Sequence, residues 1–299
     1  MRAAAPVDSP DDLFGYRHEA VDNSEKAPGQ KGEDMKLRWS VALLVVITAS
    51  VGRAQMPSAT SVVAPGGAIM ITALGHASVQ IEQGGKVVIV DPVMGMADLS
   101  QAKSADLILV TDIHADHFDP AAVAKLRKPG APVVVPPAVA DMQKIPNPTV
   151  MLNSTMRTNE EALAGITVIS VPAYNVQRGP APGQFYHPRG RGQGYLLIFS
   201  DKLAAARQKQ AGSVYVAGDT ECVPAMGTWV KDVDVALVPM NLPYTMTPAE
   251  AATCVKGFKP NVAIPYHYMG QKPEEFADAL KGEKIEVRLL NWYPTPKSR

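Results

Sequence analysis

A short segment of the chain gathers four side chains of the kinds that bind metal ions. Asp112, His114, Asp116 and His117 fall within six residues, directly after an apolar run that predicts a strand. Alternate side chains on an extended backbone share a face, so residues 112, 114 and 116 can point together, and His117 joins them if the chain turns at the following Asp-Pro step. Imidazoles mixed with carboxylates suit zinc, iron or manganese. We therefore expect a metal centre here; the alternative is a polar loop whose histidines cap a helix.

Two later strand ends each present one side chain of the same kinds. Asp219 closes the run Val214-Tyr-Val-Ala-Gly-Asp219, and His267 closes Asn261-Val-Ala-Ile-Pro-Tyr-His267. A carboxylate has two oxygens and can bridge two cations that lie a few ångströms apart. The alternative for Asp219 is a turn that caps the following helix, and His267, taken alone, is more typical of an ordinary strand end. Beside the cluster at residues 112–117, we interpret both as metal ligands.

The elements that position these residues follow from apolar runs separated by turn signals. We expect strands at residues 68–73, 78–82, 86–90, 106–110, 133–135, 166–171, 195–199, 213–217, 234–239, 261–265 and 285–290, and helices at 120–126, 137–143, 248–258 and 273–280. Strands come first as a meander and later alternate with helices, which favours two packed sheets with helices outside, in one α/β domain. The segment from Pro172 to Gly194 is rich in Gly, Pro and Arg and is typical of a lid or binding loop.

The N-terminal residues predict an export signal. A short basic start at Met35 precedes an apolar stretch, Trp39–Val51, and small residues stand before Gln55, so we expect cleavage after Ala54. The alternatives are a buried helix or a membrane anchor. Residues 1–34 are acidic and lack apolar periodicity, so we expect them to be disordered and hypothesise that translation starts at Met35. The domain then spans residues 55–299, in a periplasmic or secreted protein.

Composition narrows the partners of this domain. The chain has 299 residues, of which 46% are hydrophobic, and a formal net charge of zero. Near-neutrality argues against a nucleic-acid partner held by a general basic surface, and we expect no stable membrane insertion after signal cleavage. A small-molecule substrate is the partner we expect; nothing in the sequence indicates an oligomeric state. Cys222 and Cys254 are too few for a disulfide framework, and their spacing gives no reason to expect a single bridge.

Together the motifs resemble the metallo-β-lactamase-fold hydrolases, and within them the branch of L-ascorbate-6-phosphate lactonase-like metal-dependent hydrolases. The matching pieces occur in the expected order over about residues 68 to 290. They are Leu74-Gly-His-Ala-Ser78, Val90-Asp-Pro92, Thr111-Asp-Ile-His-Ala-Asp-His117, Val171-Pro-Ala-Tyr-Asn175, Ala217-Gly-Asp-Thr220, Tyr244-Thr-Met-Thr-Pro248 and Pro265-Tyr-His267. The resemblance implies a four-layer αβ/βα sandwich with metals bound at strand ends between the two sheets.

The resemblance also implies two divalent metal ions, zinc first, with manganese or iron as alternatives. One metal would be held by His114, position 112 and a histidine from the middle loop; the second by Asp116, His117 and His267, with Asp219 bridging. His187 is our candidate for the middle-loop ligand. Asn175 competes with it, because family members often carry a histidine after the Val-Pro-Ala stretch, although an amide is a poorer ligand. His76 and Asp91 are expected to support the site rather than to act in catalysis.

Asp112 departs from the family pattern, which usually has a histidine at this position. Three interpretations stay open. Asp112 ligates through oxygen and makes the first site more tolerant of manganese or iron; or it orients His114 from behind; or the first site is weak and one metal is bound firmly.

The expected function is metal-dependent hydrolysis of a small ester, lactone or phosphodiester by a metal-activated water. Asp116 and Asp219 are the expected catalytic carboxylates, and Asp116 could orient or deprotonate the water. Arg189 and Arg191 could grip a substrate phosphate or carboxylate, or form a solvated basic loop. Two further residues, Asn241 and Tyr244, could line the mouth of the site. The alternatives are a nuclease of the same fold and a non-catalytic binding protein on a degenerate scaffold.

Overall fold

The computed structural model describes residue 56 and residues 58–152, 156–157, 163–202 and 210–294. These residues belong to one compact unit, Arg53–Arg299. The segments predicted to be disordered (1–34) and to form the export signal (35–54) lie outside the described residues. Within the described part of the chain, none of the helices has the length and apolar character needed to span a bilayer.

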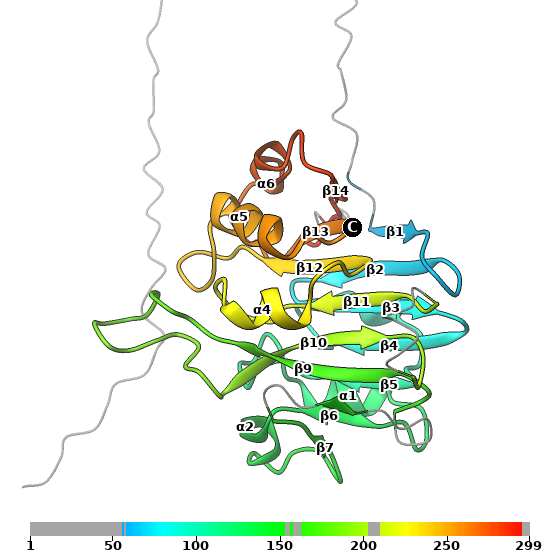
Figure 1. The fold of residues 1–299 in the computed structure, drawn as a ribbon. Helices are drawn as coiled ribbons and strands as arrows, with labels where there is room; N and C mark the ends of the chain where they lie inside the picture. Colours follow the sequence, from blue (N-terminus) through cyan, green and yellow to red (C-terminus); the bar gives the residue numbers. More distant parts are fainter. Residues whose placement is uncertain (1–55, 57, 153–155, 158–162, 203–209, 295–299) are drawn as a thin grey trace, which may run out of the picture. The chain divides into compact units, whose positions relative to one another are not determined.

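Two sheets of seven strands each form the centre of the described structure (Figure 1). The first sheet runs in chain order: β1 (Ala59–Val62), β2 (Ile69–Gly75), β3 (Ser78–Gln83), β4 (Lys86–Val90), β5 (Leu107–Leu109), β6 (Val133–Val135) and β7 (Thr149–Val150). Strands β1 to β4 pair antiparallel, with the Gly84-Gly85 turn between β3 and β4. From β4 to β7 the pairing is parallel, so the carboxyl ends of β4 and β5 lie at one edge.

In the second sheet, too, neighbouring strands are consecutive in the chain, from β14 at one edge to β8 at the other. Its strands are β14 (Glu286–Val287), β13 (Val262–Tyr266), β12 (Val235–Pro239), β11 (Ser213–Val216), β10 (Gly192–Ile198), β9 (Thr167–Ala173) and β8 (Met156–Arg157). Strands β11 to β14 pair parallel. The carboxyl ends of β11 and β13 therefore reach the same edge, and these strands deliver Asp219 and His267.

Helices cover the outer faces of both sheets. A short 3-10 helix η1 (Leu99–Gln101) and the helices α1 (Pro120–Leu126) and α2 (Pro137–Ala140) pack on the first sheet, whereas α4 (Pro224–Trp229), α5 (Pro248–Phe258) and α6 (Pro273–Ala279) cover the second (Figure 1). The inner faces of the sheets bury a shared apolar core that includes Ile71, Val88, Leu109, Val171 and Leu197. The predicted four-layer αβ/βα sandwich is confirmed.

Most predicted elements occur within one to three residues of their expected bounds. The loop predicted from Pro172 to Gly194 is shorter than expected, because β9 continues to Ala173 and β10 begins at Gly192. The strand predicted at residues 285–290 is confined to Glu286–Val287. Strand β1 and helix α4 were not predicted, since neither has a clear apolar period in the sequence.

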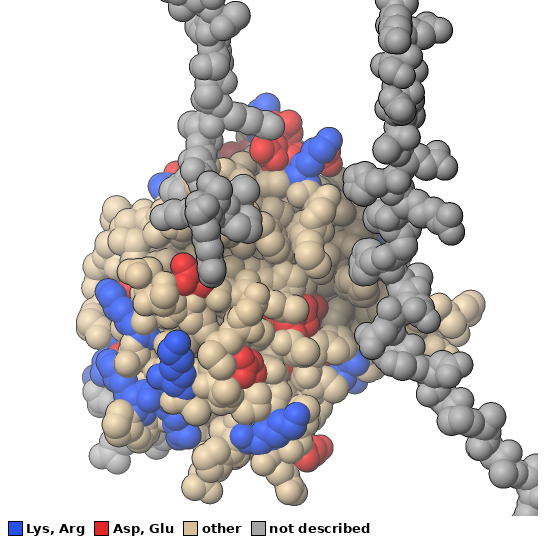
Figure 2. Space-filling model, turned by 180° about the vertical axis from the view of Figure 1, so that it is seen from behind, with Lys and Arg blue, Asp and Glu red and all other residues tan. Residues whose placement is uncertain are grey.

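Charged side chains are spread over the surface. Figure 2 shows the face turned away in Figure 1, where residues without a formal charge occupy most of the visible area and both signs of charge occur among them. This distribution agrees with the formal net charge of zero.

Cys222 and Cys254 form a disulfide, which their spacing gave no reason to expect; their Cα atoms are 5.5 Å apart. The chain after Asp219 turns back across α5, whose middle carries Cys254, and this long-range packing cannot be read from the spacing of the two residues. The bridge ties the Asp219 loop to the helix layer.

Replacing both cysteines by serine should lower the free energy of unfolding by about 3 to 4 kcal/mol, because the bridge closes a loop with a sequence separation of 32 residues. Urea denaturation of the oxidised protein and of the Cys222→Ser/Cys254→Ser variant measures this difference. An unchanged midpoint would show that the bridge adds no stability.

Candidate metal centre

The polar side chains of the site stand where strands end in unusual backbone conformations. His76 follows β2, Asp91 follows β4 and His267 follows β13, and all three have positive φ values of 50°, 48° and 48°. Residues other than glycine rarely adopt this region, and such residues concentrate at functional sites. Gly218 allows the same turn before Asp219, with φ 67°, and a Cβ there would lie 3.0 Å from the Gln193 carbonyl oxygen. The strand ends are therefore shaped to present these side chains.

Three sets of ligand-type side chains meet at this edge. In each set the ligand atoms lie within 4.8 Å of one another; the sets are Asp112, His114 and His187; His117, Asp219 and His267; and His76, Asp116 and His267. All seven residues predicted as metal ligands are thus brought together, and His76 joins them.

Asp219 belongs to the second set and also contacts His187 of the first. Its Oδ2 is 3.0 Å from Nε2 of His187 and 3.2 Å from Nε2 of His117. Its Oδ1 is 3.5 Å from Nδ1 of His267. The carboxylate can therefore contact two cations, one on each side, as a bridging ligand does.

Asp91 fixes the ring of His117 from behind. Its Oδ2 accepts from Nδ1 of His117 at 2.8 Å and from the Thr111 hydroxyl at 2.5 Å, and its Oδ1 accepts from the Thr111 amide at 2.7 Å. All three residues are buried. Because Nδ1 is bound to Asp91, Nε2 on the other side of the ring faces Asp219 and the centre. Burial raises the pKa of Asp91, although His117 and Thr111 act in the opposite direction.

His187 is held in the same way by Asn175. The Asn175 Oδ1 accepts from Nδ1 of His187 at 2.9 Å and from its backbone amide at 2.7 Å, while the Asn175 amide group donates to the carbonyl of Tyr244 at 2.8 Å. The imidazole of His187 therefore faces Asp219, and Asn175 lies behind it. His187 and Asn175, the two candidates for the middle-loop ligand, therefore have different positions. His187 faces the centre, and Asn175 orients the His187 ring.

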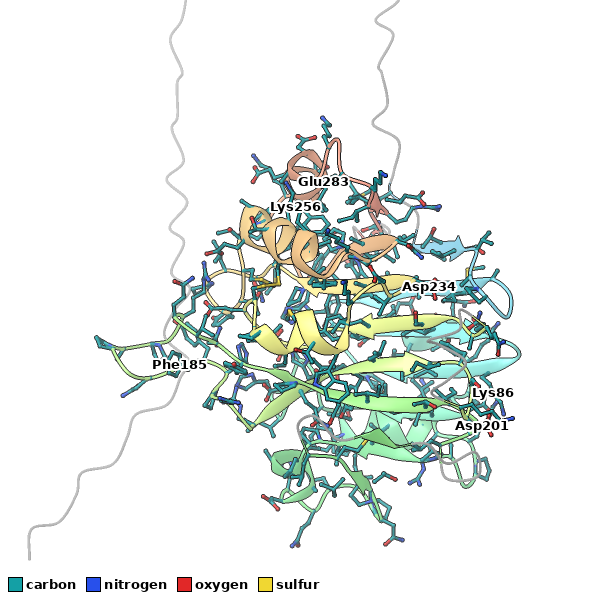
Figure 3. The ribbon with its side chains drawn as sticks, in the orientation of Figure 1. Lys86, Phe185, Asp201, Asp234, Lys256 and Glu283 are labelled. Atoms are coloured by element: carbon teal, nitrogen blue, oxygen red, sulfur yellow. A yellow bond between two sulfur atoms is a disulfide. The ribbon has the colours of Figure 1, made fainter. Side chains whose placement is uncertain are left out.

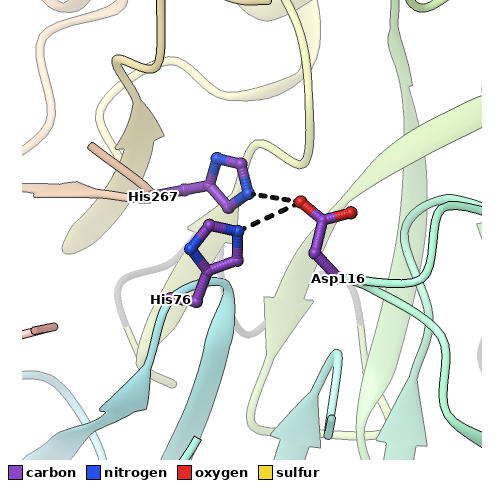
Figure 4. Close-up of side chains that lie close together, drawn as sticks. All are labelled: His76, Asp116 and His267. Carbon is purple, nitrogen blue, oxygen red and sulfur yellow. Dashed lines mark hydrogen bonds and ion pairs between the residues drawn. The ribbon is translucent and has the colours of Figure 1, made fainter. Parts of the chain in front are cut away.

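His76, Asp116 and His267 form the third set, shown in Figure 4. Oδ2 of Asp116 lies 3.0 Å from Nε2 of His76 and 3.2 Å from Nε2 of His267. Burial raises the pKa of Tyr293, so its hydroxyl keeps its proton and can donate to Nδ1 of His76, 3.0 Å away. Nε2 of His76 then carries a proton and donates to Asp116, which keeps this carboxylate ionised: burial acts to raise the pKa of Asp116, but His267, His76 and His117 lower it well below its ordinary value.

The side chain of Arg191 is bound to Asp112. Its Nε and one terminal nitrogen each lie 3.3 Å from an oxygen of this buried carboxylate, and the terminal nitrogen also donates to the Tyr186 carbonyl at 2.6 Å. The positive charge of Arg191 compensates the negative charge of Asp112. Asp112 still lies within ligand distance of His114 and His187.

Two buried atoms without hydrogen bonds indicate that these residues can bind divalent cations. Within the described part of the chain, Nε2 of His117 and Oδ1 of Asp219 are buried without a hydrogen-bond partner. A buried polar atom without a hydrogen bond costs about 1–3 kcal/mol, so two such atoms on residues of one ligand set require an explanation. A cation ligated by both atoms supplies it, and neutral imidazole with carboxylate is a donor set for zinc, manganese or iron.

Metal binding should release a proton. Burial acts to lower the pKa of His117, but the carboxylates of Asp219 and Asp91 raise it well above its ordinary value in the metal-free chain. A cation must displace this proton, so metal affinity should rise with pH across the neutral range. Calorimetric titration with zinc at pH 7 in buffers of different ionisation enthalpy measures the release; binding without it would contradict the prediction.

A pocket of about 650 Å³ opens at these residues. Predicted Asn241 and Tyr244 lie in its wall, whereas Arg189 and Arg191 are absent from its described lining. Five further lining residues were missed in the sequence: Met96, Ala115, Tyr186, Met269 and Tyr293. Ala115 and Tyr186 had a signal, since they stand beside His114 and His187; the other three stand in loops far apart in the chain.

The sequence of this chain is similar to those of known proteins. The sequence matches the beta-lactamase superfamily domain over residues 70–267. It is 32% identical over 234 residues to a UPF0173 metal-dependent hydrolase of Thermococcus kodakarensis, covering 74% of this chain and 96% of that protein.

Solved structures of related proteins have a similar fold. The crystal structure of a proposed metal-dependent hydrolase from Parabacteroides distasonis superposes with a TM-score of 0.68 at 34% identity, covering 79% of this chain and 99% of that chain. A metallo hydrolase from Ignicoccus hospitalis has a TM-score of 0.59 at 22% identity, covering 74% of this chain and 94% of that chain, and shares the fold.

Proposed function

Because the chain belongs to the beta-lactamase superfamily and is a metal-dependent hydrolase related to the UPF0173 proteins, we propose that it holds two divalent cations and hydrolyses a small ester or lactone. The observation that carries this proposal is the pair of buried atoms without a hydrogen bond, His117 Nε2 and Asp219 Oδ1, which belong to one ligand set, while Asp219 also reaches His187 of another set. Zinc is the first candidate, with manganese and iron as alternatives, since Asp112 adds oxygen to the first set.

The first cation would be held by Asp112, His114 and His187, and the second by His117 and His267, with Asp219 shared and Asp116 adjacent to the second. Bound cations supply Lewis acidity, which lowers the pKa of a water and polarises the attacked carbonyl oxygen. Asp116, ionised and held by two histidines, can accept a hydrogen bond from the attacking water and orient it. The contacts of Asp116 with His76, His117 and His267 are all made through Oδ2, so Oδ1 can accept this hydrogen bond.

Supporting roles fall to residues behind the ligands. Asp91 and Asn175 fix the rings of His117 and His187, and Arg191 compensates the charge of Asp112. Asn241 lies in the pocket wall 3.4 Å from Nδ1 of His267 and can donate a hydrogen bond to a substrate oxygen.

Metal content and turnover test the proposal together. The full chain is stripped with a chelator, reloaded separately with zinc, manganese or iron(II), and assayed on ester, lactone and phosphodiester substrates. We expect two equivalents per chain and ester or lactone hydrolysis that chelation abolishes and metal restores. One equivalent at saturation would contradict the two-cation centre, and full turnover without metal would contradict the hydrolase mechanism.

A further inference from the structure

The mouth of the pocket is bordered by exposed apolar side chains. Met96 and Met269 line the pocket and are 51% and 55% exposed, respectively. Tyr244, 43% exposed, also lines the pocket, and three more of the large exposed apolar residues lie within two sequence positions of a lining residue: Met94, Phe185 and Leu242. Phe185 stands on the loop that projects between β9 and β10 (Figure 3). Single exposed apolar residues are ordinary, but a group around one opening marks a binding surface.

Every arginine of the β9–β10 loop is bound by the protein itself. Arg178 donates to Glu221 and Glu250, each at 2.6 Å. Arg189 lies over the ring of Tyr174, 5.4 Å from its centroid, and Arg191 is bound to Asp112. The described lining of the pocket contains neither lysine nor arginine. A substrate in the pocket therefore contacts no lysine or arginine among the described lining residues. Arg189 and Arg191 are thus not placed to bind a substrate phosphate or carboxylate there, the first of the two roles considered for them.

The remaining wall matches an uncharged aliphatic group. Ala115, Tyr186 and Tyr293 join the two methionines in the lining, and the rings of Tyr186 and Tyr244 are 5.0 Å apart. Methionine and tyrosine side chains bury apolar surface, and methionine adapts to chains of different shape. The polar ligand cluster forms another part of the same wall, so the reacting group and the aliphatic group would lie in one cavity.

We propose that the substrate is an uncharged ester or lactone of an aliphatic carboxylic acid, with its carbonyl at the metal centre and its alkyl chain between Met96, Tyr244 and Met269. This inference rests on the proposed function and names its substrate class. Because burying one methylene improves binding about fourfold, kcat/KM should rise about fourfold for each methylene until the chain fills the pocket.

The test uses the metal-loaded full chain and p-nitrophenyl esters of acetate, butyrate, hexanoate and octanoate. The p-nitrophenyl monoester of adipate adds a terminal carboxylate at the length of hexanoate. We expect kcat/KM to rise along the neutral series and to fall at least tenfold from hexanoate to adipate. A flat series, or a preference for adipate, would overturn the proposal.

Substitution of the rim identifies the residues responsible. In the Met96→Gln/Met269→Gln variant, the hexanoate-to-acetate ratio of kcat/KM should fall at least tenfold, because glutamine has similar size but a polar end. Met70→Gln is the matched control: Met70 is 38% exposed on β2 and lies outside the pocket lining, so its ratio should equal that of the unchanged protein. An unchanged ratio in the double variant would contradict the assignment.

A binding measurement separates this inference from the proposed function. Alkyl hydroxamates carry a metal-chelating group and are not esters, so calorimetry with acetohydroxamate and octanohydroxamate reports on the pocket without turnover. Tighter binding of octanohydroxamate supports the aliphatic site even if no ester is hydrolysed, a result that would reject the proposed hydrolysis alone. Equal affinities would reject the aliphatic site, whatever the hydrolytic activity.

Discussion

Asp219→Asn should abolish hydrolysis and remove most of the bound metal. Asp219 contacts both His117 and His187 through Oδ2, and its Oδ1, 3.5 Å from His267, has no hydrogen bond among the described residues. The amide has a single good acceptor and cannot balance the charge of two cations. Loss of an outer-shell partner typically costs 10- to 100-fold, so loss of the bridging ligand should exceed about 100-fold in both activity and affinity.

Metal analysis by mass spectrometry and steady-state kinetics on the same preparation check this result. Asp141→Asn is the matched control, because Asp141 is exposed at the end of α2, outside the pocket lining, and its replacement should leave metal content and kcat/KM unchanged. An Asp219→Asn protein that retains two metals and turnover would show that the carboxylate bridges nothing.

Asp91→Asn should weaken metal binding about 10- to 100-fold and also destabilise the fold. The buried carboxylate accepts from Thr111 and from Nδ1 of His117. An asparagine turns one acceptor into an NH₂ group that faces these donors, so the ring of His117 loses the partner that directs Nε2 to the centre. Breaking a buried charged pair costs about 3–5 kcal/mol.

Zinc titration against a competing chelator gives the affinity, and urea denaturation of the metal-free chain gives the stability. The combination matters, because a purely structural role of Asp91 would lower the stability and leave the affinity of the folded protein unchanged. Unchanged affinity in Asp91→Asn would therefore contradict the role of this residue in orienting His117.

Much of the fold could be predicted because the strands are continuous apolar runs bounded by Gly, Pro and Asp. Helix α5 begins and ends where predicted: Thr247 caps Glu250, and the Glu250 side chain returns to the Thr247 amide. The predicted metallo-β-lactamase fold is confirmed by the family match and by the solved relatives. Strand β14 was overestimated because an apolar pattern does not state how many residues find a partner strand.

The candidate site could be predicted where ligands follow strands in the sequence, as at residues 112–117. Its walls could not, because Met96, Met269 and Tyr293 come from loops that meet only in the folded chain. The position of His76 shows the same limit: its bond to Asp116 joins residues 40 positions apart. The ion pair between Asp112 and Arg191, separated by 79 positions, also depends on tertiary packing. Because Arg191 is held by Asp112, it does not line the pocket as a substrate-binding residue would.

The left-handed backbone at His76 and His267 affects how knock-out variants of these residues should be chosen. Alanine would delete the imidazole and keep the conformational penalty of a Cβ at positive φ, roughly 1–2 kcal/mol. Glycine deletes the same ring and is comfortable in that conformation. Gly and Ala replacements at one position thus remove the same imidazole but differ in backbone strain. Comparing the two variants separates the loss of activity caused by the missing ring from the loss of fold stability.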